Sequence, residues 1–185
     1  MSAAHQPIRV LLVDPTLPVR ELLHEYLRRR GMVVTAVGTV AAARVAWTVE
    51  RYDVVICEIA LPDGEAAQVF TQFREYGCGL LATAASLSVP TAIATLQAGA
   101  EDVLLKPLRV RDVYDAVRGA AARGRVRERE RLARGILISA ARCQSLPEAT
   151  ALRAILVAEA ALFAEDPVLH DACTRVVAIA EQQHR

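Results

Sequence analysis

The sequence has little of several features that mark common classes of protein. Aromatic residues make up only 4% of the 185 positions, and no uninterrupted apolar run approaches the length that crosses a membrane. The first seven residues do not resemble a secretory signal peptide. The four cysteines are too widely spaced for a zinc knuckle or a redox dithiol, and they are Cys57, Cys78, Cys143 and Cys173. These absences favour a reduced, soluble, cytoplasmic protein.

A large net charge is also absent. The formal net charge is +1, so no global attraction to nucleic acid or to a membrane surface is expected. The charges are unevenly distributed, however. Residues 109–142 contain ten arginines and four acidic residues, whereas residues 148–185 contain six acidic residues and three arginines.

Five short apolar runs alternate with segments of helical periodicity. The run at 54–57 is rich in β-branched residues and fits a parallel strand that is buried on both faces. The five predicted strands are 8–13, 32–37, 54–57, 79–83 and 102–105, and the predicted helices are 18–30, 39–50, 65–76, 90–99 and a fifth from Arg109. This alternation predicts a parallel sheet with helices on both faces.

A polar residue follows or ends four of the predicted strands. These residues are Asp14, Glu58, Thr83 and Lys106. In an open parallel sheet the carboxyl ends of the strands meet at one edge, where the functional crevice lies. The sequence therefore predicts a polar site at this edge.

The pattern also fits nucleotide- or flavin-binding enzymes, but the chain lacks their phosphate loop. Residues 14–18 contain two prolines, no glycine and one hydroxyl, whereas such loops are rich in glycine or in serine and threonine. The four histidines have no nucleophile at a readable spacing, and they are His5, His24, His170 and His184. We therefore do not predict an enzyme.

Four segments resemble a known family, namely Val10–Asp14, Glu58–Gly64, Ala82–Ala84 and Ala98–Pro107. Over residues 7–122 the chain resembles the receiver domain of two-component response regulators. That resemblance implies a flavodoxin-like, doubly wound, five-stranded parallel sheet. In the family, the lysine at the position of Lys106 reaches back to a phosphorylated aspartate, and the Lys-Pro bond is commonly cis.

The chain departs from the family in three parts of the phosphorylation relay, namely the acceptor, the metal site and the switch. Glu58 stands where the family has its aspartate, and its extra methylene moves the carboxylate by about one C–C bond length. Pro15 and Thr16 replace acids that would help to bind Mg²⁺, and Asp14 alone remains. Val103 replaces the aromatic switch residue, which leaves Thr83 and Lys106 as phosphate-sensing positions. We therefore predict a pseudo-receiver with no cofactor and with lost or weak Mg²⁺ binding.

Two interpretations of Glu58 remain open. In one, its longer carboxylate pairs with Lys106 and mimics the phosphorylated state. In the other, the same pair only satisfies the charges of a vestigial site.

The residue pattern in the last third of the chain predicts helices. A charged segment from Arg123 to Arg131 fits a solvated helix, and the apolar positions that follow it fit three short amphipathic helices. The predicted organisation is a receiver-like domain at 1–122 and, at 123–185, a helical linker with a three-helix output or dimerisation module. The sequence leaves open whether 123–145 is one helix or two.

The segment Ala133–Ile138 resembles the start of the ANTAR domain, an RNA-binding module of transcription antiterminators. The resemblance implies RNA contacts at the nearby arginines, namely Arg125, Arg127, Arg131 and Arg134. An RNA-binding end should be basic and carry aromatic residues, whereas residues 148–185 are acidic and contain a single aromatic, Phe163.

The leading functional prediction is an atypical, phosphorylation-independent signalling protein of the response-regulator type. It would act through protein partners in a signalling pathway, as a homodimer, without a small-molecule substrate and without a membrane. The alternative is an ANTAR-type RNA-binding antiterminator that carries a pseudo-receiver.

Overall fold

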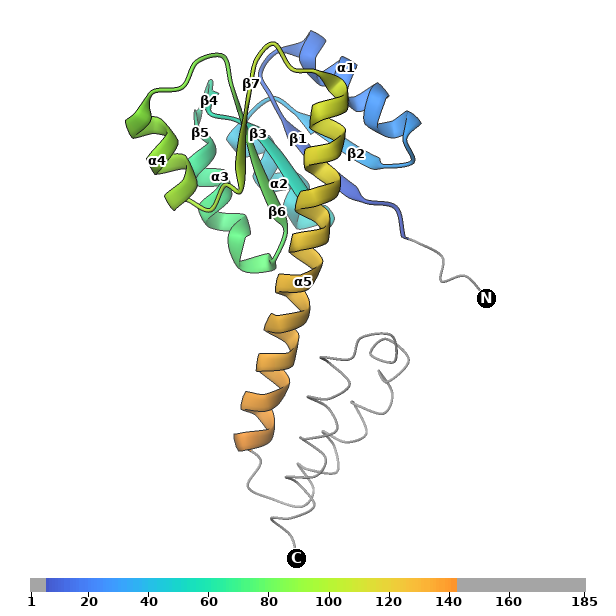
Figure 1. Ribbon diagram of the computed structural model, residues 1–185, viewed down its shortest axis with the longest axis vertical. Coiled ribbons are helices and arrows are strands. Elements are labelled where there is room, and N and C mark those ends of the chain that lie inside the picture. The colour runs from blue at the N-terminus through green and yellow to red at the C-terminus, as the bar shows by residue number, and fades with distance from the viewer. Residues whose placement is uncertain (1–5, 143–185) are drawn as a thin grey trace, which may run out of the picture. The chain divides into compact units, whose positions relative to one another are not determined.

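The structure, a computed structural model, describes residues 6–142. Strands and helices alternate along this part of the chain (Figure 1). The strands are β1 (Arg9–Val13), β2 (Val33–Val37), β3 (Val54–Glu58), β4 (Ala60–Leu61), β5 (Gly64–Glu65), β6 (Gly79–Ala84) and β7 (Asp102–Leu105). The helices are α1 (Leu17–Arg29), α2 (Val40–Val49), α3 (Ala66–Phe73), the 3-10 helix η1 (Arg74–Tyr76), α4 (Val89–Gln97) and α5 (Val110–Arg142).

Five of the strands form one parallel sheet in the order β2-β1-β3-β6-β7. Side chains alternate across it, because successive residues of a strand point to opposite faces. Leu11 and Val13 pack in a core with residues of α2 and α3, whereas Val10 and Leu12 pack in a second core with residues of α1 and α5. The sheet is therefore covered on both faces, as the sequence predicts.

Local signals in the sequence fix where the helices begin and end. The hydroxyl of Thr39 accepts a hydrogen bond from the amide of Ala42 and so caps the start of α2. Arg28 and Arg29 lie in the last turn of α1, where they complement the helix dipole, and Gly31 follows with a φ of 82°.

A short hairpin of β4 and β5 follows β3 and was not predicted as strand. Its antiparallel pairs are Ala60 with Glu65 and Leu61 with Gly64. Asp63 in its turn accepts hydrogen bonds from the amides of Val40 and Ala41, at 2.8 and 2.9 Å. These bonds at the start of α2 lower the pKa of the Asp63 carboxyl. The hairpin is thereby fastened to α2.

Helix α5 continues without a break from Val110 to Arg142, so the predicted linker is helical as far as Arg142. The chain divides into two compact units, residues 1–125 and 126–185. The domain boundary at 122/123 stays a prediction, and the two helices predicted after Pro147 lie outside the described residues. Within residues 6–142, no helix combines the length and apolarity needed to cross a membrane.

The first unit holds α5 very close to the start of β6. A Cβ atom added at Gly79 would lie 2.6 Å from the Cβ of Ala120, and one added at Gly124 would lie 2.8 Å from the carbonyl oxygen of Gly77. Glycine is therefore required where the helix and the strand meet.

Candidate functional site

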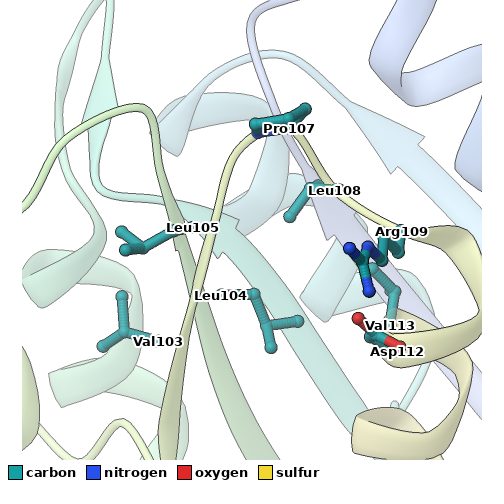
Figure 2. A pocket seen from close by; sticks show the side chains of 8 residues that line it. All are labelled: Val103, Leu104, Leu105, Pro107, Leu108, Arg109, Asp112 and Val113. Carbon is teal, nitrogen blue, oxygen red and sulfur yellow. The ribbon is translucent and has the colours of Figure 1, made fainter.

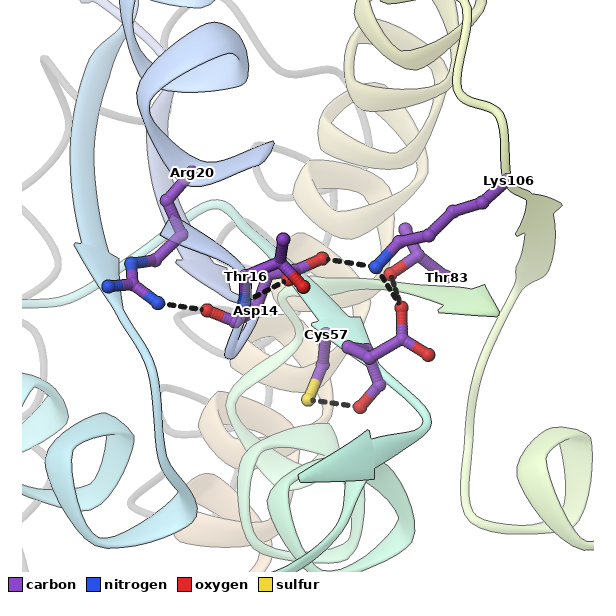
Figure 3. A network of polar contacts seen from close by, with 7 residues as sticks. Asp14, Thr16, Arg20, Cys57, Thr83 and Lys106 are labelled. Carbon is purple, nitrogen blue, oxygen red and sulfur yellow. Dashed lines mark hydrogen bonds and ion pairs between the residues drawn. The ribbon is translucent and has the colours of Figure 1, made fainter. Parts of the chain in front are cut away.

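The four polar residues predicted at the sheet edge come together in one polar cluster (Figure 3). Glu58 ends β3 and is in register with Thr83 of β6, while Asp14 and Lys106 directly follow β1 and β7. Because all four strands run in parallel, their carboxyl ends bring these side chains to the same edge.

Lys106 joins the two carboxylates of the polar cluster. Its Nζ atom lies 2.7 Å from Oδ2 of Asp14 and 2.6 Å from Oε2 of Glu58. The Thr83 hydroxyl donates a hydrogen bond of 3.0 Å to the same Glu58 oxygen. Asp14 is 0% exposed and Glu58 is 7% exposed, so both carboxylates are held inside the protein. The sequence predicted the pair of Glu58 with Lys106, but it did not predict the bridge to Asp14.

The contacts of Lys106 together change its pKa more than burial does. Burial alone lowers the pKa of the ammonium, but the hydrogen bonds and ion pairs with Asp14 and Glu58 raise it above its ordinary value. Lys106 therefore stays charged at neutral pH. It is also the only lysine in the sequence. The other 21 of the 22 Lys and Arg residues are arginines.

Two residues near Asp14 were not predicted to take part. The amide of Thr16 donates a hydrogen bond of 2.8 Å to Oδ1 of Asp14, the Asx turn that an Asp-Pro-Thr sequence favours. The Arg20 guanidinium donates to the carbonyl oxygen of Asp14 at 2.5 Å and lies over Gly38. No sequence signal links Arg20 to Asp14, because the contact depends on how α1 packs beside β1.

The polar cluster does not fit Mg²⁺, the ion that the receiver resemblance implies. Mg²⁺ requires several oxygen ligands in near-octahedral geometry. Here Oδ1 and Oδ2 of Asp14 are both hydrogen-bonded within the protein, Oε2 of Glu58 is bonded to Lys106 and Thr83, and Pro15 has no ligand atom. Among residues 6–142, no group of three or more His, Cys, Asp or Glu side chains could hold a metal ion.

The switch position, Val103, lies beside a separate pocket of about 400 Å³ at the edge strand β7 (Figure 2). Apolar residues of β7 and of the segment that leads into α5 line it together with Arg109 and Asp112. The Lys106-Pro107 peptide bond that leads out of β7 is cis, as the resemblance implies. Val103 carries no ring, so an aromatic switch of the family's kind cannot operate at this position.

The arginines predicted to contact RNA lie on α5. Arg127 and Arg131 are exposed and Arg125 is half-buried. Arg131 forms an ion pair of 2.7 Å with Glu128 on the same helix, which offsets part of the local positive charge.

Comparison with known proteins identifies the family of the chain. The family described as "Response regulator receiver domain" matches residues 10–118. The transcriptional regulatory protein TcrX of Mycobacterium tuberculosis is 32% identical over 120 residues, which cover 64% of this chain and 51% of TcrX. The response regulator MprA of Mycolicibacterium vanbaalenii is 31% identical over 119 residues, which cover 63% of this chain and 52% of MprA. The chain thus spans about half the length of these curated relatives.

Solved structures agree with the predicted fold. A CheY-like receiver domain from Methanospirillum hungatei superposes with a TM-score of 0.62 at 19% identity, covering 66% of this chain and 99% of that domain. A two-component response regulator from Clostridium difficile gives a TM-score of 0.60 at 21% identity, covering 63% and 97%. The prediction of a receiver fold is confirmed. By the match over residues 10–118, the chain belongs to the response regulator receiver family.

Proposed function

We propose that this protein is a phosphorylation-independent signalling regulator that acts through protein contacts and not as an enzyme. The proposal rests on the contacts of Glu58, which stands at the position of the phosphate acceptor. Its Oε2 atom is bonded to both Lys106 and Thr83 without any added group. The contacts that a phosphoryl group would make with these two residues are thus already made by a side chain.

The chemistry around Glu58 supports the loss of phosphoryl transfer. In-line attack depends on placement of the acceptor oxygen to within about an ångström, and glutamate is longer than aspartate by one methylene. Phosphoryl transfer also relies on a metal ion to neutralise developing charge, and the polar cluster does not fit Mg²⁺. Neither the acceptor side chain nor the metal site therefore meets the requirements of phosphoryl transfer.

Acetyl phosphate with Mg²⁺ tests this proposal directly. We expect intact-protein mass spectrometry to find no phosphoryl adduct on the wild-type chain, because Glu58 is held by Lys106 and Thr83. A receiver with an aspartate acceptor, treated in the same reaction, serves as the positive control. The double variant Pro15→Asp/Glu58→Asp shows whether the two departures suffice to explain the loss. A phosphoryl adduct mapped to Glu58 would contradict the proposal.

Whether Glu58 mimics phosphorylation or is vestigial can be decided by one comparison. If the carboxylate mimics the phosphorylated state, Glu58→Ala weakens self-association or partner binding. If both stay unchanged in Glu58→Ala, the mimic interpretation fails. The two bonds to Oε2 favour the mimic, because they fix the carboxylate against the two phosphate-sensing residues.

The outer face of α4 supports a role in protein contacts. Val89, Ile93 and Leu96 follow one another at helical spacing and are 73%, 51% and 51% exposed. Residues 78–100, which include α4, contain no Asp, Glu, Lys, Arg or His. An exposed apolar stripe of this kind commonly marks an interaction site.

We assign this stripe to a second copy of the chain. A two-fold contact sets each helix against its own copy, so a charged residue near the axis would face its own like charge. Helix α4 carries no charge and meets that requirement. Another receiver domain, that of NtrC4, was solved as a beryllofluoride-activated dimer and is 22% identical.

The variant Ile93→Glu is expected to weaken the dimer at least tenfold, because two carboxylates would meet at an apolar contact. Light scattering coupled to size-exclusion chromatography measures this as a change from dimer to monomer. The matched control is Val45→Glu on α2, where the replaced side chain is 64% exposed. Equal dimerisation of wild type and Ile93→Glu would show that α4 is not the contact.

RNA binding is the second candidate function. The exposed arginines of α5 favour it, since they stand in a segment with ten arginines and four acidic residues. It predicts an RNA complex that weakens steeply with salt and is lost when Arg125, Arg127, Arg131 and Arg134 are neutralised. Crosslinked pull-down of the intact protein, with its RNA and protein fractions both sequenced, separates the two functions.

A further inference from the structure

We infer that the face formed by α1 and the first turns of α5 binds single-stranded RNA through Arg30 and Arg118. The inference deepens the second candidate function, RNA binding, and rests on it. It assigns to RNA a surface that the sequence does not predict, in addition to the arginines Arg125, Arg127, Arg131 and Arg134.

Arg30 and Arg118 lie over the same aromatic ring. The Cζ atom of Arg30 is 5.2 Å from the ring centroid of Tyr114, and the Cζ atom of Arg118 is 5.8 Å from that centroid. Arg30 also lies 4.9 Å from the ring centroid of Tyr26, on α1. These cation–π contacts hold two guanidinium groups close together, one from the end of α1 and one from α5.

The charge of Arg30 is not neutralised by the acid nearest to it in the sequence. That acid is Glu25, which forms ion pairs with Arg28 at 3.3 Å and with Arg29 at 2.6 Å. Arg30 itself forms no ion pair with a carboxylate of the described residues. Because its side chain is exposed, its N–H groups are available to an external anion.

Arg118 is also without a carboxylate partner in the described part of the chain. Asp115 precedes it by three residues on α5, a spacing at which ion pairs can form, but Arg118 lies over Tyr114 instead. Arg111 and Arg125 stand seven residues before and after Arg118, which places them on the same side of the helix. The face therefore carries a line of positive charge that the single carboxylate of Asp115 reduces but does not cancel.

A single-stranded nucleic acid fits this face better than an acidic protein segment does. A guanidinium can bind a phosphate through two parallel hydrogen bonds, and neighbouring guanidiniums suit a ligand with charges in a row. The tyrosine rings and the planar guanidiniums also offer flat surfaces on which unpaired bases can stack. An acidic peptide would use the charges of the face but not its flat surfaces.

The test is the affinity of the full chain for a short, unstructured, fluorescein-labelled RNA, measured by fluorescence anisotropy at several salt concentrations. The variant Arg30→Gln/Arg118→Gln is expected to bind about tenfold more weakly at about 0.1 M salt, because two phosphate contacts are lost. The slope of log K against log salt concentration should become shallower by about 1.4, as expected for two contacts with a single strand.

The matched control is Arg44→Gln/Arg51→Gln. Both arginines are exposed, and they belong to α2 and the loop after it, where α2 packs on the opposite face of the sheet. Arg51 also lies over an aromatic ring, 4.8 Å from the centroid of Tyr76. This variant removes the same charge, so its affinity for the RNA should change by less than about twofold.

Substitutions of Tyr114 separate the role of the ring from that of the charges. Tyr114→Phe keeps the ring and should bind the RNA as wild type does. Tyr114→Leu removes the ring and should bind more weakly with an unchanged salt slope, because no charge is lost. The emission of Trp47, the single tryptophan, shows whether each variant is folded.

Two results would overturn the inference. One is an equal effect of the two double variants on RNA affinity. The other is tighter binding of a polyglutamate peptide than of an RNA with the same number of charges, which would assign the face to an acidic protein.

Failure of the second candidate function gives a different result. If the wild-type chain forms no salt-sensitive complex with RNA, RNA binding is wrong and the inference fails with it. If Arg30→Gln/Arg118→Gln binds as wild type does, while neutralising the four arginines from Arg125 to Arg134 abolishes the complex, RNA binding stands and only the inference fails.

Discussion

Gly79→Val is expected to lower the free energy of unfolding by about 3 kcal/mol, near the upper end for overpacked sites. A Cβ at this position would lie 2.6 Å from the Cβ of Ala120 and 2.8 Å from its carbonyl carbon and oxygen. Backbone atoms cannot rotate away as a side chain can, so α5 must move off the sheet. Urea unfolding followed by the fluorescence of Trp47, the single tryptophan, measures the loss.

Gly119→Ala is the matched control for this prediction. Its added Cβ would meet only the guanidinium end of Arg123, at 3.1 Å, and that side chain is flexible. Alanine also favours a helix interior over glycine by up to about 1 kcal/mol. We therefore expect no loss of stability, and a similar loss in both variants would show that the contact with Ala120 is not the cause.

Phe73→Ala is expected to lower the free energy of unfolding by about 3–5 kcal/mol, as for other fully buried phenylalanines. Phe73 is 0% exposed, and its ring stacks on Trp47 with the ring centroids 4.2 Å apart. Its removal leaves a cavity beneath the indole, so the emission of Trp47 should change in the folded state as well. Chemical denaturation gives the free energy, and the native emission spectrum reports the packing.

Tyr76→Ala provides the comparison for Phe73→Ala. Tyr76 also contacts Trp47, with ring centroids 5.2 Å apart, but it is 46% exposed. Its loss should cost less than that of Phe73, because nearly half of its surface is already in water. Equal losses from both variants would contradict the view that burial, and not ring contact alone, sets the effect.

The positions of the strands and of the polar edge could be predicted from the sequence because they depend on local patterns. The run that ends at Glu58 is apolar throughout, and a residue at the end of such a strand falls at the edge wherever the other strands lie. Thr83 was predicted in the same way, as the last residue of the predicted strand 79–83, which corresponds to β6. These two residues are hydrogen-bonded in the structure.

The contacts that cross between elements could not be predicted. Lys106 lies 92 positions from Asp14 in the sequence, and only the order of the strands places β7 near enough for its lysine to reach Asp14. Asp63 caps α2 from 23 positions away, so its role is visible only once the hairpin is folded.

Gly124 shows how a local rule can mislead. In a sequence, glycine argues against a long continuous helix, because it is a poor helix former. In the structure α5 passes through Gly124 without a break, and at that residue the helix lies close to the carbonyl oxygen of Gly77. The glycine is needed for close packing, and the gain from packing exceeds the cost in helix propensity.

The scarcity of lysine also decides how this protein responds to chemistry directed at amines. Acetylation, ubiquitin-type conjugation and amine-reactive crosslinkers all require an accessible, uncharged lysine amine. Apart from a terminal amine, the chain offers these reactions only Lys106, which is 19% exposed, bonded to two carboxylates and held in its charged form. The described part of the chain therefore presents almost no lysine target, and crosslinking of this chain is better done with reagents that attach to carboxyl groups.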